Sequence, residues 1–168
     1  MTSWQFYPQT RALPEHLARV VTVFEAATEH IGSSAWKLTS NQVLGLVAEP
    51  LANLGFRVET GATRAQKVYV PVLFGRQGRV TKAFEVDAYS EQKGTVIEVE
   101  AGRGVVNNQF LKDLFEACVM PSVAYLVIAV RSDYRGLNDF ERVCSFLDSL
   151  YASDRLRLPL TGVLILGY

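Results

Sequence analysis

The chain has 168 residues, of which 49% are hydrophobic and 20% charged, and its 17 Lys and Arg balance its 17 Asp and Glu to a net charge of zero. Such a composition is that of an ordinary globular protein with a hydrophobic core, and it excludes collagen-like and low-complexity chains. The zero net charge speaks against a generally basic nucleic-acid binder, although it leaves room for a local basic patch.

The chain shows no signal for secretion or membrane insertion. Its first residues lack a basic stretch followed by a long apolar run. The longest apolar stretch, 123–130, is too short to span a bilayer. We therefore expect a soluble, cytoplasmic protein without a membrane partner.

Apolar residues at helical spacing predict the first two elements. One helix covers 14–31, with Pro14 in its first turn. A second helix starts at Thr39 or Ser40, either of which can cap it, and runs toward Gly55. Pro50 should kink or divide this second helix, because proline lacks the backbone N–H that helix interiors require.

Strand signals dominate the next part of the chain. Residues 56–59 and 67–74 read as one long bent strand or as two short ones, and 82–90 and 95–101 read as a hairpin. A helix over 107–120, capped by Asn107 or Asn108, leads into 123–130, whose unbroken apolar run is typical of a strand buried on both faces. A helix capped by Asn138 and a strand over 163–166 complete the chain.

This order predicts an α/β fold. The strand at 95–101, the helix at 107–120 and the strand at 123–130 form a βαβ unit with parallel strands, so we expect a mixed sheet with helices on both faces. The length predicts one domain over 1–168, with N-terminal helices at 14–54, a core at 56–131, and a C-terminal helix and strand at 138–168.

The hairpin at 82–101 carries four acids on one face. Side chains alternate along a strand, so Glu85 shares a face with Asp87, and Glu98 shares a face with Glu100. A turn centred on 92–93 sets Asp87 opposite Glu98 and Glu85 opposite Glu100. Facing like charges destabilise a sheet, and a divalent cation with oxygen ligands would relieve them. The alternative is a solvated sheet face balanced by Lys or Arg.

These residues resemble the motif of the PD-(D/E)xK nuclease superfamily. The motif reads here as Val86-Asp87 followed by Glu98-Val99-Glu100, without the common proline before the aspartate and with Glu100 in place of the usual lysine. The Glu-x-Glu form, followed by an Asn-containing stretch and a helix, is similar to type II restriction endonucleases of the BamHI and BglII kind. The resemblance covers roughly 41–131.

The resemblance implies a restriction-endonuclease-like core of order αβββαβ with an extra N-terminal helix, and a Mg²⁺-dependent endonuclease in which Mn²⁺ can substitute. Asp87 and Glu98 would be metal ligands, joined by the backbone carbonyl of Val99. Glu100 would act as general base or as a ligand through water. Glu49, on the helix before the first strand, would hold a second metal ion or its water, unless it is an ordinary surface residue.

The implied partner is DNA, and a homodimer would provide the two active sites that cutting both strands requires. Basic and amide side chains near the hairpin are the expected nucleic-acid contacts, although an ordinary charged turn explains some of them equally well: Arg76, Arg79, Lys82, Arg103, Asn107 and Asn108. One alternative function is a catalytically inactive nuclease-fold module for nucleic-acid binding or assembly. Another is an unrelated α/β domain with an acidic face.

Overall fold

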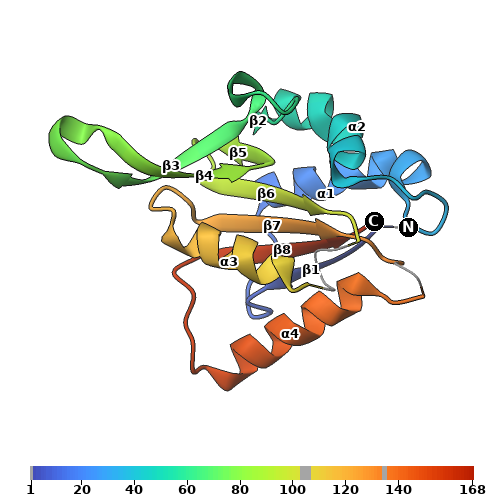
Figure 1. Cartoon of the computed structure of the whole chain (residues 1–168). Helices are drawn as coiled ribbons and strands as arrows, with labels where there is room; N and C mark the ends of the chain where they lie inside the picture. The colour runs from blue at the N-terminus through green and yellow to red at the C-terminus, as the bar shows by residue number, and fades with distance from the viewer. Residues whose placement is uncertain (1, 103–106, 134–135) are drawn as a thin grey trace.

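The computed structural model describes residues 2–102, 107–133 and 136–168 (Figure 1). The helices are α1 (Glu15–Ile31), α2 (Ser40–Asn53), α3 (Gln109–Val119) and α4 (Asp139–Ser153). The strands are β1 (Ser3–Tyr7), β2 (Arg57–Val58), β3 (Val68–Phe74), β4 (Val80–Val86), β5 (Ala88–Ser90), β6 (Thr95–Glu100), β7 (Tyr125–Val130) and β8 (Gly162–Gly167). Two 3-10 turns, η1 (Arg64–Gln66) and η2 (Arg76–Gly78), precede and follow β3.

The described residues form a 6-stranded mixed sheet in the order β1-β8-β7-β6-β5-β2. β6, β7 and β8 are parallel, and α3 and α4 make the two crossovers between them. The predicted βαβ unit and mixed sheet are therefore confirmed. β1 was not predicted: it pairs antiparallel with β8, at the far end of the chain, so its pairing is a long-range contact that no local pattern announces.

Helices cover both faces of this sheet, as predicted, and each face has its own core (Figure 1). α1 and α2 pack on one face and α3 and α4 on the other. β7 contributes to both, because Val127 points toward α1 and α2 while Leu126 and Ile128 point toward α3 and α4. Full burial of such side chains stabilises the fold by roughly 1.5–3 kcal/mol each. This two-sided burial explains why the strand is apolar at every position.

The predicted capping of α2 is confirmed, and of the two effects predicted for Pro50, a kink or a division, the division does not occur. Thr39 and Gln42 form a capping box at its start. The helix continues through Pro50 to Asn53. The carbonyl that proline deprives of a partner is that of Leu46, which is exposed to solvent and lies only two turns from the helix end.

The predicted strand over 82–90 is broken at Asp87 into β4 and β5. β5 stays in the main sheet, paired with β2 and β6, whereas β4 pairs only with β3 in a separate two-stranded arm that projects beyond the sheet (Figure 1). Val86 packs in the core under α3 and α4, and Ala88 packs in the core under α1 and α2. Alternation along 82–90 predicts one apolar face with Phe84, Val86 and Ala88, and this prediction is wrong because Val86 and Ala88 lie in different cores. Of the two alternatives for 56–74, two short strands is correct.

The two predicted asparagine caps have opposite outcomes. Asn138 caps α4, accepting a hydrogen bond of 3.1 Å from the Glu141 N–H. Asn108 precedes α3 in the left-handed conformation, φ 53°, without a side-chain cap, so that capping prediction is wrong. None of the described helices combines the length and the apolar character needed to cross a membrane.

Replacing Thr39 by Ala removes the α2 capping box, and we expect a loss of about 1 kcal/mol of stability. The melting temperature should fall by about 2–4 °C. Thr22→Ala is the matched control, because Thr22 is exposed inside α1 and Ala is the better helix former there. Equal destabilisation by both substitutions would contradict the capping argument.

Candidate active site

β6 presents its two glutamates to the side of the sheet that α3 covers. Glu98 and Glu100 alternate along the strand with Ile97 and Val99, which are buried on the opposite side against α1 and α2. The predicted sharing of a face is therefore confirmed. This face is not a free solvated surface, because α3 packs over it and contributes Asp113, only 6% exposed.

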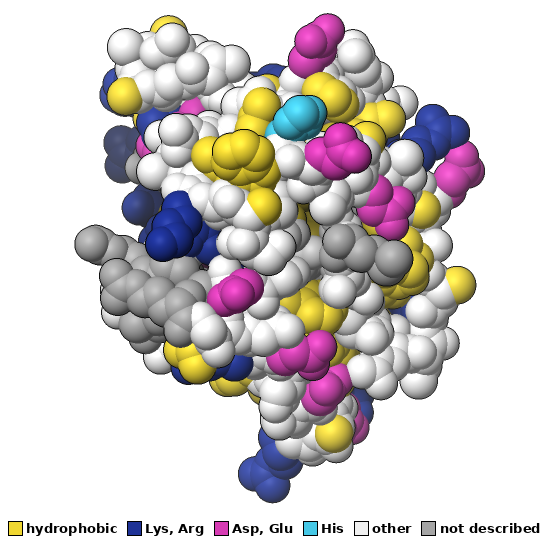
Figure 2. Space-filling view, turned by 90° about the vertical axis from the view of Figure 1, so that its right-hand side faces the viewer, with side chains coloured by type: hydrophobic (Ala, Val, Ile, Leu, Met, Phe, Trp, Pro, Cys, Tyr) yellow, Lys and Arg dark blue, Asp and Glu magenta, His cyan; other side chains and the backbone are white. Residues whose placement is uncertain are grey.

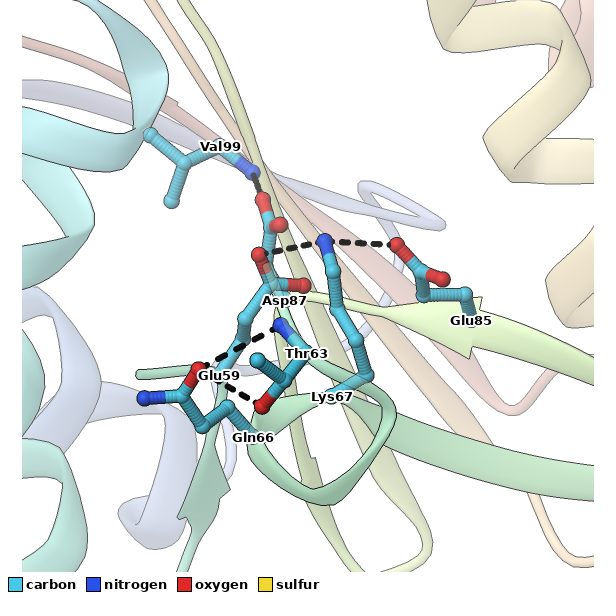
Figure 3. Close-up of polar contacts among 7 residues, drawn as sticks. All are labelled: Glu59, Thr63, Gln66, Lys67, Glu85, Asp87 and Val99. Carbon is cyan, nitrogen blue, oxygen red and sulfur yellow. Dashed lines mark hydrogen bonds and ion pairs between the residues drawn. The ribbon is translucent and has the colours of Figure 1, made fainter. Parts of the chain in front are cut away.

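Asp87 joins this group from the bend between β4 and β5. The β5–β6 register pairs Ala88 with Ile97, and its continuation brings Asp87 beside Glu98. The Val99 N–H donates to Asp87 Oδ2 at 2.7 Å (Figure 3). The Glu59 N–H donates to the backbone carbonyl of Asp87 at 2.8 Å, so both neighbouring strands hold the bend.

Glu85 does not belong to the group. Because the chain turns out of the sheet at Asp87, Glu85 pairs with Tyr69 in the β3–β4 arm instead of lying opposite Glu100, so that prediction is wrong. Its carboxylate accepts an ion pair of 2.8 Å from Lys67 Nζ. Such pairing with a basic side chain was the other possibility that the sequence left open for Glu85.

Lys67 joins the base of the arm to the edge of the acidic group (Figure 3). Its Nζ lies 2.6 Å from Glu59 and 2.8 Å from Glu85. Glu59 is buried, and Lys67 is largely covered. These two carboxylates raise the pKa of Lys67, so the amine stays charged. Neither Glu59 nor Lys67 was predicted at this site, and a glutamate at the end of a two-residue strand gave no signal.

Burial makes the acids of this group hard to ionise. It raises the pKa of Asp87 to about 6; the nearby charges of Glu59 and Asp113 add to the rise, and the Val99 N–H opposes it. Burial is also the main cause that raises the pKa of Glu98 well above its usual range, followed by the charges of Asp87 and Asp113. The group therefore favours a bound proton or a bound cation.

Glu100 and Asp113 behave as one acid pair. Burial and then the charge and hydrogen bond of Glu100 raise the pKa of Asp113 to about 8. Burial also raises the pKa of Glu100, while the hydrogen bond to Asp113 opposes the rise. The buried Asp113 Oδ2 has no hydrogen-bond partner. The raised pKa values favour a proton on this pair, and the shifts place it on Asp113 more readily than on Glu100.

Asp113 was missed because the face of α3 was assigned by its apolar residues alone. The apolar spacing of the helix over 107–120 predicts an inward face of Phe110, Leu111, Leu114, Phe115 and Cys118. In the structure Phe110 and Leu114 are buried and Leu111 and Cys118 pack against the core, as predicted, but a small rotation of the helix brings Asp113 inward and leaves Phe115 63% exposed. The available signal was the spacing of Phe110, Asp113, Leu114 and Ala117, one helical face with an acid in it.

The other predicted site residues that the structure describes are exposed on the surface. Glu49 is exposed on α2, and the charges that raise the pKa values of Asp87 and Glu98 come from other acids. Arg76, Arg79 and Lys82 are exposed on the arm. Asn107 and Asn108 are exposed just before α3, and Arg103 lies outside the described residues.

The donor atoms of this group are of the kind that a hard divalent cation prefers, but they are not gathered around one point. Every donor is a carboxylate or carbonyl oxygen, and Asp113 Oδ2 is a buried oxygen without a donor. Within 2–102, 107–133 and 136–168, however, no three His, Cys, Asp or Glu side chains are gathered closely enough to hold a metal ion. A cation here would thus use two carboxylates and complete its shell with a carbonyl and water.

Comparison with known proteins supports the fold. No family model and no curated protein matches the sequence. Among solved structures, free BglII, a restriction endonuclease, aligns with a TM-score of 0.52 and 11% identity over 99% of this chain and 78% of its own. The chain therefore has a restriction-endonuclease-like α/β fold, as predicted.

Asp113→Asn should stabilise the metal-free protein as the pH rises. The folded-state pKa of Asp113, about 8, exceeds its ordinary value of 3.8, so the wild type loses stability between these values as the unfolded chain ionises more readily. Asn carries no charge, and its amide can donate to Glu100. Urea unfolding in EDTA should show a gain of about 1 kcal/mol or more near pH 8 that shrinks toward pH 4.

Asp154→Asn is the matched control, because Asp154 is fully exposed and Arg157 lowers its pKa. Its replacement should give no gain that grows with pH. A pH-independent effect of Asp113→Asn would contradict the assigned acid pair.

Lys67→Met should destabilise the protein by roughly 2–3 kcal/mol, because it leaves the buried Glu59 carboxylate without its partner. Breaking a fully buried pair costs about 3–5 kcal/mol, and the cost here is lower because Lys67 is partly exposed. Adding Glu59→Gln to Lys67→Met should restore part of the loss. Arg157→Gln, which breaks a fully exposed pair, should leave the stability almost unchanged. Denaturant unfolding of the four proteins measures this, and no recovery in the double variant would refute the stranded-charge account.

Proposed function

We propose that this chain is a Mg²⁺-dependent endonuclease that hydrolyses DNA phosphodiester bonds. The observation that carries the proposal is the group of poorly ionising acids at the end of β6, Asp87, Glu98, Glu100 and Asp113, in a restriction-endonuclease-like fold. A group that resists its own negative charge is suited to binding a cation or moving a proton.

In this proposal Asp87 and Glu98 hold the metal ion, together with the Val99 carbonyl. The hydrogen bond from the Val99 N–H orients the Asp87 carboxylate and ties it to the strand that carries Glu98. When bound, the metal ion would supply charge to stabilise the phosphorane-like transition state and to favour ionisation of water. Mn²⁺, which takes similar oxygen ligands, would substitute.

Glu100 is proposed as the general base that takes the proton of the attacking water. A raised pKa suits this task, because a base works best when its pKa lies near the working pH. Asp113 donates a hydrogen bond to Glu100 and orients it. The pair thus replaces the lysine usual at this motif position with a proton-holding unit of two acids.

The remaining sequence-derived residues keep supporting roles in the proposal. Glu49 would hold a second metal ion or its water, from its exposed position on α2. DNA contacts are proposed for the exposed side chains of Arg76, Arg79, Lys82, Asn107 and Asn108. The same role is proposed for Arg103, which lies outside the described residues. A homodimer would bring two such sites to a duplex.

The test combines thermal unfolding with plasmid nicking. Wild-type protein in about 5 mM Mg²⁺ or Mn²⁺ should melt about 3–6 °C higher than in EDTA, the effect of a ligand at about ten times its Kd. It should also nick supercoiled plasmid. Glu98→Gln and Asp87→Asn should lose both effects, because each removes a proposed ligand. Glu100→Gln should keep most of the thermal shift but lose nicking by about 10²-fold or more.

Glu91→Gln is the matched control: Glu91 is an exposed acid in the turn of the same hairpin. It should behave as wild type in both assays. Glu49→Gln tests the proposed second site, and full activity in that variant would remove Glu49 from it.

Two other outcomes decide between the proposal and its alternatives. A metal-dependent thermal shift without cleavage of DNA or RNA would favour the inactive nuclease-fold module. In that alternative the Glu100–Asp113 pair has no catalytic role. If the metal ion causes no thermal shift and the protein cleaves no nucleic acid, the proposed metal site is refuted.

A further inference from the structure

The β3–β4 arm (68–86) extends from the site, and the acids Asp87, Glu98, Glu100 and Asp113 all lie outside it. Residues 73–82 are exposed without interruption, and Figure 1 shows the arm projecting beyond the central sheet. A strand from Val80 to Val86 spans about 20 Å. The tip of the arm therefore stands clear of the body that carries the acids.

The arm lies in the basic part of an otherwise neutral chain. Between Glu59 and Glu85 there is no acid, and five basic residues occur: Arg64, Lys67, Arg76, Arg79 and Lys82. On the side of the molecule away from the arm, Figure 2 shows acidic side chains from top to bottom, with Lys and Arg side chains among them. The segment that forms the arm, by contrast, carries basic residues without acids between Glu59 and Glu85, which favours a polyanion there.

The tip of the arm combines these cations with exposed apolar side chains. Leu73 and Phe74 are 61% and 59% exposed, and Val80, which pairs with Phe74, is 46% exposed. Arg76 and Arg79 flank them. A soluble surface does not ordinarily hold such side chains at the end of a projection unless they contact a partner.

The tip has a tight backbone that fixes these side chains. Gln77 and Gly78 are both left-handed, with φ 59° and 74°, as in the two-residue turns that close hairpins. The Gly75 N–H donates to the Arg79 carbonyl at 2.7 Å. Arg76 and Arg79 therefore stand on either side of a closed turn, with Phe74 directly behind it.

The base of the arm is buried and held by ion pairs, whereas its tip is exposed. Val68, Val70 and Val86 are buried in the core under α3 and α4. Lys67 adds its ion pairs to Glu59 and Glu85. A two-stranded ribbon is only marginally stable by itself. The buried base therefore stabilises the arm and keeps its tip in a defined position.

We propose that the arm inserts Phe74 between base pairs of duplex DNA, while Arg76 and Arg79 hold the phosphates beside the opened step. Apolar wedges flanked by cations kink and partly unstack a duplex in this way. The choice of DNA over another polyanion rests on the proposed function. With an arm of about 20 Å, the opened step would lie about six base pairs from the acids.

The test uses wild-type protein and a closed circular plasmid in EDTA, so that no cleavage intervenes. A metal-independent topoisomerase relaxes the plasmid while protein is bound, and the linking number is read after protein is removed. An inserted wedge unwinds DNA, so wild type should leave the plasmid negatively supercoiled. Phe74→Ala should abolish this change and weaken binding by about tenfold, the effect of losing one stacked aromatic.

Phe115→Ala is the matched control, because Phe115 is a phenylalanine of similar exposure, 63%, on α3 outside the arm. It should retain the linking-number change. Arg76→Gln and Arg79→Gln should each lower the slope of log affinity against log salt by about 0.9 when the arginine contacts a phosphate, whereas Phe74→Ala should leave that slope unchanged.

Three outcomes would overturn the proposal: DNA binding by wild type without a linking-number change, an undiminished change in Phe74→Ala, or dissociation of an oligomer by Phe74→Ala, which would make the tip an interface between copies. Failure of the nuclease proposal gives a different result. Wild type would then unwind the plasmid in EDTA but fail to nick it with Mg²⁺.

Discussion

The structure depends on the enclosure of acids between β6 and α3. Glu98 and Glu100 face a helix that adds Asp113, and Asp87 joins them from the neighbouring bend. Removing carboxylates from water costs free energy unless a proton, a cation or donors compensate. The pKa values of all four acids are raised, so the compensation inside the described protein is incomplete. Buried acids with raised pKa values are found at many functional sites, where such shifts are put to use.

The bend at Asp87 connects this site to the rest of the molecule. It places one carboxylate against β6 and directs β4 out of the main sheet. The arm and the site are thus two results of one change in chain direction. Lys67 links them, because its amine lies between a buried acid beside the bend and an exposed acid on the arm. A disturbance of the arm base should therefore be felt by Asp87.

The likeness to BglII, at 11% identity, bears on the fold alone. The functional argument comes from the acids themselves. Glu100 and Asp113 also interact with each other: the charge and hydrogen bond of Glu100 add to the burial that raises the pKa of Asp113. Two acids with one proton carry less charge than two carboxylates.

The sequence by itself determined the parts that depend on local periodicity. These were α1, α2, the alternation of β6, the doubly buried β7 and the β6–α3–β7 crossover, because side-chain spacing and burial pattern are local properties. Only the tertiary structure decided the pairing of β1 with β8, the break at Asp87, the rotation of α3 that buries Asp113, and the Lys67–Glu59 contact. Each of these depends on contacts between segments that are distant in the sequence, and local spacing does not encode such contacts. For the buried acids, only the tertiary surroundings can offset the free energy that burial costs.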